Sequence, residues 1–322
     1  MTLQVLTPGL LTTVQDAGRQ GWRHLGVARC GVLDPISASL ANRLVGNDDD
    51  AAVLELTLQG PTLQFDAPVR IAICGAMIAA RFEPDVGEPC TVYGGRPIEL
   101  PAGTLRLGTL HGGARAWLAF AGGIDVPQVL GSRSTDLRGC FGGFEGRALR
   151  AGDALTLLAP PLLECDWSRM PHWWIGSANE AHAATPFRYV PSSHPIAPRL
   201  ADRTWQASAR SNRQGLRLEG NAIEISGNEE ISAAVAPGTV QLPPDGHPIV
   251  LLADAQTVGG YPRLGHVIAA DLPRLAQLRP GEELRFAPCD PQTATRLACA
   301  ARAQVARISL MIDYQFDRGN IG

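Results

Sequence analysis

Short runs in which apolar and polar residues alternate recur along most of the chain, and Gly and Pro residues separate them. Alternation with a period of two is typical of a half-buried β-strand, and the Gly/Pro clusters mark turns. The residues from Leu3 to Val14 alternate loosely around Pro8-Gly9, which predicts two short strands. Further strands are predicted at Val53–Leu58, Thr62–Phe65, Val69–Ile73, Thr91–Tyr93, Leu105–Leu107 and Ala116–Phe120. Turns at this density favour a barrel or a sandwich over a doubly wound sheet, so the predicted fold class is mainly β.

Helical spacing is found in two places. Ile36, Leu40, Ala41 and Leu44 recur with a helical period after Asp34-Pro35, a good N-cap followed by a tolerated first-turn proline. An Ala/Arg-rich stretch at 292–303 predicts a short helix at the edge of the fold, and the tail from residue 317 is expected to be frayed. The helices are therefore expected to be few and short.

One motif occurs in both halves of the chain. Arg19-Gln20-Gly21-x-Arg23 in the first half is echoed by Arg213-Gln214-Gly215-x-Arg217 in the second. Each half also closes alike, at 150–157 and at 279–286, where Gly permits a tight turn that feeds a strand. We therefore predict two related β units that face each other across a groove, at residues 1–165 and 200–322, joined by a Trp- and Pro-rich connecting segment at 166–199.

Composition and charge exclude several classes of protein. The 322 residues, 45% hydrophobic and 18% charged, suffice for two globular domains. A net charge of −3 provides no basic field for nucleic acid or an anionic membrane. All 28 basic residues are arginines, so a P-loop lysine, a Schiff-base lysine and covalently attached biotin are excluded from this chain.

The expected location of the chain is the cytoplasm. The first residues lack the basic and long apolar segments of a secretory signal, and no apolar run reaches the length of a membrane span. The seven cysteines are scattered and include no Cys-x-x-Cys pair, which is typical of reduced thiols.

In the first half, polar residues that could carry chemistry lie in Gly-rich turns, where a β scaffold displays function. They are Gln15, Asp16, Arg19, Asp34, Asn42 and Asn47, with capping and turn roles open as alternatives for Asp34 and Asn47. Glu55 lies inside an apolar strand, so it must be paired or protonated if it is buried. Around Arg133 and Ser134, small residues alternate with arginines, a pattern that suits an anion bound by amides and guanidinium groups, although a solvated turn explains it nearly as well.

In the second half, the densest polar group surrounds two turns, 241–248 and 254–262. Asp254 and Gln256 leave an apolar strand just before Gly259-Gly260-Tyr261-Pro262, from where their side chains could enter the mouth of a barrel. A structural role for both is equally open. The seven histidines show no metal-binding spacing, so no metal is expected.

Six ordered blocks of the sequence resemble one family, whose members include the C subunit of 5-oxoprolinase, KipA, the second subunit of allophanate hydrolase and the biotin-dependent carboxyltransferase domain. The blocks are Pro8–Gly21, Ala41–Asn47, Leu54–Pro61, Gly131–Thr135, Ser211–Leu218 and Pro243–Pro262. They extend over nearly the whole chain.

This resemblance implies two tandem cyclophilin-like β-barrel units. It also implies one component of an ATP-dependent 5-oxoprolinase, which opens 5-oxoproline to glutamate together with an A subunit and a KipI-like B subunit. The ATP would be used by the complex, and the chain is not expected to be active alone. The resemblance leaves two alternatives open: a carboxyltransferase component that moves a carboxyl group from carboxybiotin, held by a partner, to urea or a similar amide, and a non-catalytic KipA-like antagonist of a kinase inhibitor.

The family resemblance also implies roles for the candidate residues. Arg19, Arg133 and Arg213 are expected to bind anions, and Asp16, Asp254 and Gln256 to act as catalytic groups that orient the amide. The remaining candidates for substrate binding are Gln15, Asn42, Ser134, Asn212 and Tyr261.

The chain departs from the family pattern at several positions. Ala233-Ala234-Val235 replaces an acidic or small-residue step, Gln214 stands where methionine is common, and Val258 replaces a threonine before Gly259-Gly260. These changes are expected to affect the choice of substrate rather than the fold.

Overall fold

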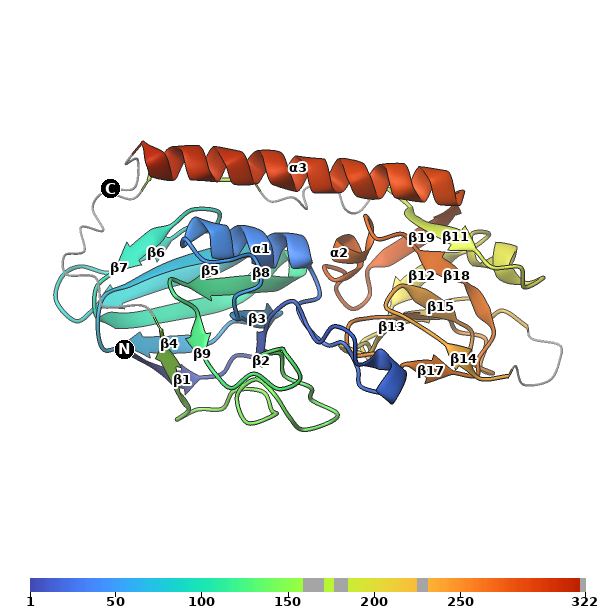
Figure 1. Cartoon of the computed structure of the whole chain (residues 1–322), viewed down its shortest axis with the longest axis horizontal. Coiled ribbons are helices and arrows are strands. Elements are labelled where there is room, and N and C mark those ends of the chain that lie inside the picture. The colour runs from blue at the N-terminus through green and yellow to red at the C-terminus, as the bar shows by residue number, and fades with distance from the viewer. Residues whose placement is uncertain (159–170, 177–184, 225–230, 319–322) are drawn as a thin grey trace. The chain divides into compact units, whose positions relative to one another are not determined.

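The computed structural model describes residues 1–158, 171–176, 185–224 and 231–318. The chain divides into two compact units (Figure 1). The first unit comprises Met1–Gly18, Pro35–Glu180 and Gln304–Gly322, and the second comprises Arg19–Asp34 and Ala181–Ala303. A segment from the N-terminal half thus belongs to the second unit. The boundaries expected at 165 and 199 stay a prediction, because much of the connecting segment lies outside the described residues.

The first unit is built on one curved antiparallel sheet of ten strands in its described part. The strands are β1 (Thr2–Thr7), β2 (Leu11–Gln15), β3 (Val53–Thr57), β4 (Thr62–Phe65), β5 (Val69–Pro84), β6 (Cys90–Val92), β7 (Ile98–Leu100), β8 (Gly103–Phe120), β9 (Ile124–Asp125) and β10 (Ala154–Leu157). The main order is β2-β3-β8-β4-β1-β10-β9, with β5 pairing β6, β7 and β8. The sheet carries a continuous apolar core that includes Leu54, Ile71, Phe82 and Leu118.

The long pair β5 and β8 differs from the sequence prediction. Separate strands are expected at Leu105–Leu107 and Ala116–Phe120, but both lie in β8, which pairs with β5 along most of its length. Glycines let the strands bend instead of ending: a Cβ at Gly75, whose φ is 105°, would lie 2.8 Å from the Trp117 ring. The pairing register shifts between Gly75 and Met77, as a bulge requires.

Glu55 on β3 is buried, and it has the partners that its burial requires. Its Oε2 accepts a hydrogen bond from Trp117 Nε1 at 3.0 Å, and its Oε1 lies 4.0 Å from Arg115 Nε. The sequence predicts that Glu55, if buried, is either paired or protonated. The structure shows it paired.

The helix expected after Asp34 is confirmed as α1 (Pro35–Leu44). Its buried side includes Ala38, Leu40, Ala41 and Leu44, and it packs against β5 and β8 (Figure 1). The apolar residues whose helical spacing predicted α1 therefore lie mainly on the face that packs against the sheet.

The second unit is a closed barrel. Its strands are β11 (Phe187–Pro191), β18 (Arg263–Val267), β15 (Thr239–Gln241), β16 (Ile249–Leu251), β13 (Gly215–Glu219), β12 (Thr204–Ala207) and β19 (Glu283–Pro288), in that order around the barrel. Parallel pairing of β11 with β19 closes the ring, and the other pairs are antiparallel. The short strands β14 (Ala233–Ala234) and β17 (Val258–Gly259) pair separately, and η1 (Arg23–Leu25), η3 (Ala197–Leu200) and α2 (Leu272–Leu275) lie in the connections. The mainly β architecture of two units is confirmed.

The matching ends of the two halves form the same turn. Asp153 N donates to Arg150 O at 3.2 Å, and the Asp153 carboxylate accepts from Arg150 N at 2.7 Å. Glu282 and Arg279 repeat this pair of bonds at 3.1 and 3.0 Å. Gly152 and Gly281 have φ values of 91° and 84°, so each turn needs its glycine before β10 or β19 begins.

The C-terminal helix is longer than the sequence predicted. Helix α3 runs from Pro291 to Asp317, whereas the expected edge helix ended at residue 303. Asp290 caps its first turn by accepting from Thr293 N at 2.7 Å and from the Thr293 hydroxyl at 2.9 Å. No Gly or Pro follows Pro291 within the helix, so nothing local stops it. Among the described residues, no helix has the length and apolarity needed to cross a membrane.

A buried carboxylate joins β11 to α2 in the barrel. Asp271 accepts from Arg188 N at 2.7 Å and Arg188 Nε at 3.0 Å, while its Oδ1 lies 2.6 Å from Arg188 Nη2 and 3.4 Å from Arg274 Nη1. Burial opposes ionisation of Asp271, but the hydrogen bonds from Arg188 and the charges of both arginines outweigh it and lower the pKa of the carboxyl. Asp271 is therefore held ionised although its side chain is fully buried.

We expect Asp271→Ala to lower the free energy of unfolding by roughly 2–3 kcal/mol at pH 7, because it strands the Arg188 guanidinium. A pKa lowered by folding stabilises the protein above the ordinary aspartate pKa of about 4, and this contribution is lost as the pH falls through the folded-state value. Urea unfolding at pH 7 and pH 3 should therefore show the difference from wild type narrowing in acid. Glu283→Gln, at an exposed position on β19, is the control; an equal loss for Asp271→Ala at both pH values would contradict this account.

Candidate functional site

In the first unit, the carboxylate of Asp16 holds a loop that carries Arg133. Asp16 Oδ1 accepts from Gly18 N at 2.8 Å and from the Ser132 and Ser134 hydroxyls at 2.5 Å each. Oδ2 accepts from Arg133 N at 2.5 Å, and Ser134 Oγ in turn accepts from Asp16 N at 3.0 Å. Asp16 is 9% exposed and both serines are fully buried. The carboxylate is thus fully used in fixing the backbone of the loop.

A second tie lies next to this one. Gln15 Nε2 donates to Thr13 Oγ1 at 3.1 Å and to Thr135 O at 3.3 Å, while Thr135 N and Oγ1 both donate to Val14 O, at 3.0 and 2.9 Å. Strand β2 and the loop after Gly131 are therefore bonded residue by residue. Gln15 and Ser134, both expected to bind substrate, are held in protein contacts.

Arg133 is the group that this loop presents. Its Nε donates to Val126 O at 3.1 Å, which fixes the start of the guanidinium, and its side chain is half-buried. Its two terminal amino groups have no hydrogen-bond or ion-pair partner within the described ranges. A guanidinium held at one nitrogen and open at the other two suits bidentate binding of a carboxylate.

Asn42 and Asn47 together hold the connection that follows α1. Asn42 Nδ2 donates to Ala51 O at 2.8 Å, and Asn42 Oδ1 accepts from Asn47 Nδ2 at 3.2 Å. Asn47 also bonds Phe120 O at 2.8 Å and Gly122 N at 2.7 Å. These contacts satisfy both side chains, so the turn role that was open for Asn47 is the one that the structure displays.

In the second unit, Arg213 and Asp254 form a buried bidentate pair. Arg213 Nε and Nη2 lie 2.9 Å from the two oxygens of Asp254, and Nη2 also donates to Gly31 O at 2.5 Å. The Asp254 and Arg213 side chains are 4% and 3% exposed. The pair joins the strand ends of the barrel to the segment Arg19–Asp34, which Cys30 N reinforces by bonding Ala253 O at 3.0 Å.

The segment Arg19–Asp34 itself contains three arginines, Arg19, Arg23 and Arg29. Arg19, expected to bind anions, is buried in the second unit, and its backbone N donates to Arg29 O at 2.7 Å. Arg23 Nη2 donates to the backbone carbonyl of Val235 and, at 3.5 Å, to that of Gln256. Burial, and then the charge of Arg29, lowers the pKa of Arg23. Sequence reasoning did not select Arg23, although it occupies the same motif position as Arg217.

The remaining candidates of the second unit lie at turns beside the barrel. Gln256 Nε2 donates to Oε1 of the buried Gln241 at 3.3 Å, and a Cβ at Gly259 would lie 2.5 Å from Gln241 Nε2. Asn212 is exposed, and its Oδ1 accepts from the backbone N atoms of Gln214 and Gly215 at 2.9 and 3.3 Å. Tyr261 is 44% exposed. Gly259 therefore leaves space for the side-chain amide of Gln241.

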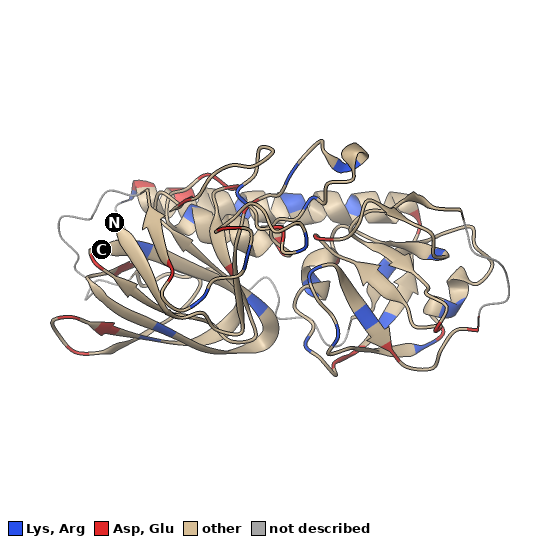
Figure 2. Cartoon of the chain, turned by 90° about the horizontal axis from the view of Figure 1, so that it is seen from below, with Lys and Arg blue, Asp and Glu red and all other residues tan. Residues whose placement is uncertain are grey.

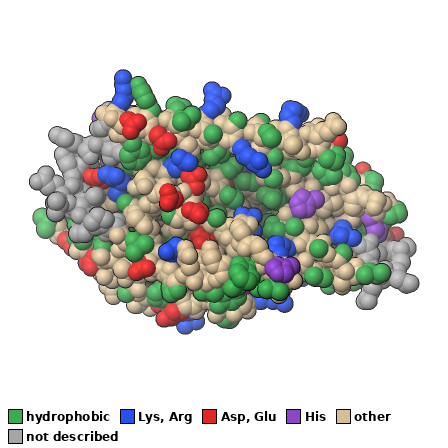
Figure 3. All heavy atoms as spheres, in the orientation of Figure 1, with side chains coloured by type: hydrophobic (Ala, Val, Ile, Leu, Met, Phe, Trp, Pro, Cys, Tyr) green, Lys and Arg blue, Asp and Glu red, His purple; other side chains and the backbone are tan. Residues whose placement is uncertain are grey.

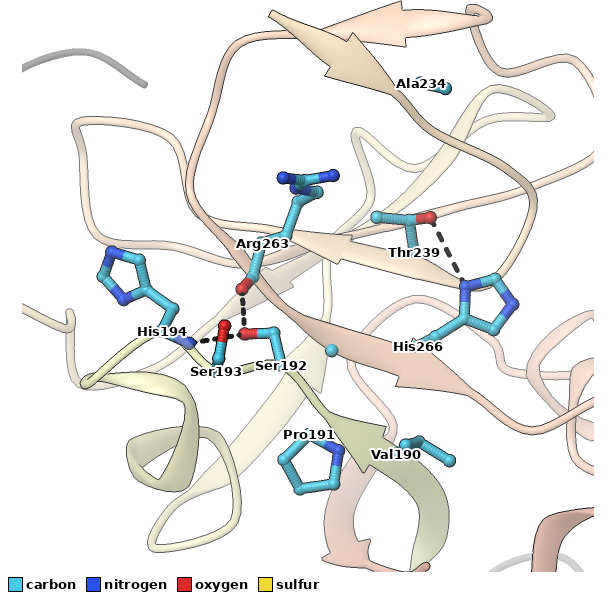
Figure 4. Close-up of a pocket in the computed structure, with 10 residues that line it drawn as sticks. Val190, Pro191, Ser192, Ser193, His194, Ala234, Thr239, Arg263 and His266 are labelled. Carbon is cyan, nitrogen blue, oxygen red and sulfur yellow. Dashed lines mark hydrogen bonds between the residues drawn. The ribbon is translucent and has the colours of Figure 1, made fainter. Parts of the chain in front are cut away.

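The structure also contains a pocket that sequence reasoning missed. It measures about 410 Å³ and lies on the barrel against β11, β15 and β18 (Figure 4). Its lining residues are Val190, Pro191, Ser192, Ser193, His194, Ala234, Thr239, Arg263, Gly265 and His266. Ser192 to His194 fall in the expected connecting segment, so the sequence offers no reason to associate them with Arg263 and His266.

Charges are mixed in both units rather than separated by sign. Arginines and carboxylates are interspersed along the ribbon (Figure 2), and both occur among hydrophobic side chains on the face seen in Figure 3. Among the described residues, no group of three or more His, Cys, Asp or Glu side chains could hold a metal ion. The chemistry that the described sites offer is recognition of anions by arginine.

Comparison with known proteins gives a consistent family. A model of the carboxyltransferase domain, subdomain A and B, matches residues 25–288. The C subunit of the 5-oxoprolinase of Escherichia coli (strain K12) is 38% identical over 298 residues, covering 91% of this chain and 93% of that protein. The urea amidolyase of Lachancea kluyveri is 33% identical over 91% of this chain but only 17% of that protein. The crystal structure of the Kluyveromyces lactis urea carboxylase matches with a TM-score of 0.80 and 29% identity, covering 94% of this chain and 29% of that chain.

We expect Arg213→Gln and Asp254→Asn each to lower the free energy of unfolding by roughly 3 kcal/mol, because each leaves a buried charge without its partner. The double variant should lose less than the sum of the two, since neither charge then remains. Denaturant unfolding of the four proteins measures this cycle, with Asp245→Asn at an exposed turn as the control. Additive losses would mean that the pair does not act as a unit.

Proposed function

Because the chain belongs to the carboxyltransferase family of subdomains A and B, we propose that it is the C subunit of an ATP-dependent 5-oxoprolinase complex. Membership confirms the family resemblance of the six motif blocks. The observation that carries the proposal is the end-to-end match with the C subunit of a bacterial 5-oxoprolinase, whose length this chain nearly equals. Its partners would be an A subunit and a KipI-like B subunit in the cytoplasm, and the complex would open 5-oxoproline to glutamate.

The residues of this chain can supply binding and orientation to that reaction. Hydrolysis of the lactam C–N bond adds water across it, and the ring carbonyl must be activated for attack. The chain has no lysine and no P-loop, so we assign the use of ATP to the partners. What this chain offers is a guanidinium that can hold the substrate carboxylate while the ring carbonyl is attacked.

Arg133 is the residue to which we assign that binding. Its free amino groups match a carboxylate, and the Asp16 carboxylate holds its backbone in place. We therefore assign Asp16 a positioning role, with Gln15 and Ser134 supporting the same loop. In this proposal Asn42 supports the scaffold through its bonds to Ala51 O and Asn47.

The candidates of the second unit are assigned on the same grounds. Arg213 and Asp254 neutralise each other, so we propose that they shape the strand ends rather than react. Gln256 and Tyr261, at the turns, remain proposed binding groups for an amide within the second unit itself, with Asn212 holding its own turn and Arg19 contributing positive charge.

A carboxyltransferase is the second candidate function, favoured by the family description and by the match to a urea amidolyase. In that case a partner would carry the biotin, since this chain has no lysine to attach it. The substrate would be urea or a similar amide. The two functions share the need to bind a small carboxylate or carbamate, which an arginine serves in either case.

We expect Arg133→Ala to raise the KM for 5-oxoproline at least tenfold in the complex reconstituted with the A and B subunits, because one charged hydrogen-bonding group is lost. Glutamate release with and without ATP is the measurement. Arg138→Ala, an exposed arginine of the same loop, should behave as wild type.

Three results would overturn parts of this proposal. Wild-type turnover by Arg133→Ala would remove Arg133 from the site. Avidin-sensitive carboxylation of urea without oxoproline turnover would favour the carboxyltransferase. A stable complex that hydrolyses no oxoproline and carboxylates no amide would instead favour a KipA-like antagonist.

A further inference from the structure

The pocket on the barrel of the second unit carries a positive charge, and no acidic residue lines it. Arg263 carries its permanent charge, and His194 and His266 stand at its two sides (Figure 4). None of the ten lining residues is Asp or Glu. The guanidinium of Arg263 has no hydrogen-bond or ion-pair partner in the part of the chain that the structure describes. The pocket can therefore receive an anion without breaking an existing ion pair.

The strand register places these groups together. Thr239 pairs with His266 across β15 and β18, and Gln241 pairs with Arg263 after a register shift. Thr239, Arg263 and His266 thus project from the same flank of the barrel, while the alternate residues Val240 and Leu264 are buried. The register shift gives the two strands the offset that brings Arg263 toward Ala234 above the pocket (Figure 4).

Two glycines allow the close packing of the strands and of His266 around the pocket. A Cβ at Gly265, in the pocket lining, would lie 2.5 Å from Val190 O, so this position can carry no side chain while β11 stays paired. A Cβ at Gly238, whose φ is 97°, would lie 2.8 Å from His266 Nε2. The missing side chains leave room for the His266 imidazole and for the close pairing of β18 with β11.

The polar groups on either side are held in fixed positions. Thr239 Oγ1 accepts from Ala236 N at 3.1 Å and lies 3.4 Å from His266 Nδ1. Ser192 Oγ donates to Arg263 O at 2.5 Å and accepts from His194 N at 3.1 Å, which holds the turn after β11 over strand β18. Burial lowers the pKa of His266, so its imidazole is neutral at pH 7 and the positive charge comes from Arg263.

The shape and chemistry of the pocket define the class of its ligand. One guanidinium fits one carboxylate, whereas a phosphate group usually finds a second cation or a set of backbone amides. Val190, Pro191 and Ala234 add apolar surface for a compact body beside that charge. A volume of about 410 Å³ suits a molecule of amino-acid size.

We propose that this pocket is a binding site for a small monocarboxylate with a compact apolar or cyclic body, and that it is separate from the Arg133 loop. Arg263 would bind the carboxylate, Thr239 and His266 would offer hydrogen bonds at one side, and Ser193 at the other. The site needs no partner protein and no turnover, and only the choice of 5-oxoproline as its probe rests on the proposed oxoprolinase function.

The test uses the isolated full chain and calorimetric titration with four probes: 5-oxoproline, glutamate, 2-pyrrolidone and inorganic phosphate. 5-Oxoproline should bind, and 2-pyrrolidone, the same ring without the carboxylate, should bind at least tenfold more weakly. Arg263→Gln should weaken 5-oxoproline binding at least tenfold. Arg285→Gln, an exposed arginine on β19 of the same barrel, is the matched control and should bind 5-oxoproline as wild type does.

Histidine NMR signals provide a second readout that does not depend on stability. The imidazole signals of His266 should shift when 5-oxoproline is added to wild type but not to Arg263→Gln. The proposal is overturned if Arg263→Gln binds as wild type does, if 2-pyrrolidone binds as well as 5-oxoproline, or if phosphate is the tightest of the four probes. Loss of binding in Arg133→Ala alone would place the carboxylate at the first-unit loop and overturn it as well.

Discussion

The bonds of the Asp16 carboxylate are the constraint on which the account of the first unit depends. One buried side chain accepts from Gly18 N, from the hydroxyls of Ser132 and Ser134, and from Arg133 N. Three hydrogen-bond donors come from a loop more than a hundred residues away in sequence, so a single ionised group fixes a long-range turn. Because Arg133 belongs to that turn, the turn determines where its guanidinium lies. Asp16, which the sequence suggested as a catalytic group that orients the amide, is therefore proposed to position Arg133 instead.

In the second unit, arginine side chains make the contacts that hold the fold together. Arg213 binds Asp254 and Gly31 O, Arg188 binds Asp271, and Arg23 bonds two backbone carbonyls. The planar fork of arginine can bond a carboxylate and a carbonyl together, which a lysine ammonium does with less geometric definition. In a chain without lysine, some arginines hold the fold, while the terminal amino groups of others, such as Arg133 and Arg263, have no partner among the described residues.

Local patterns predicted the local structure well. The helical period after Asp34 gave α1, and the matching Gly turns before β10 and β19 were found where the sequence repeats. Predictions failed where the hydrophobic pattern is weak or where the structure depends on residues far away in the sequence. Separate strands are predicted on either side of the glycines at 108, 112 and 113, but β8 continues through them without a break. Most of α3 is exposed, with only Ser309 and Ile312 buried, so it has little apolar stripe to extend the prediction past residue 303.

The sites were harder to predict because they depend on long-range backbone contacts. The segment Arg19–Asp34 is attached to the barrel through the backbone carbonyls of Gly31 and Ala253. Such backbone contacts cannot be recognised from the pattern of side chains in the sequence. A double-mutant cycle between Asp16→Asn and Arg133→Ala in the reconstituted complex tests the central claim most directly. If Asp16 acts through Arg133, its substitution should lower kcat/KM for 5-oxoproline in wild type but change little in the Arg133→Ala background. Equal losses in both backgrounds would show that Asp16 acts on the reaction by itself and would contradict the account.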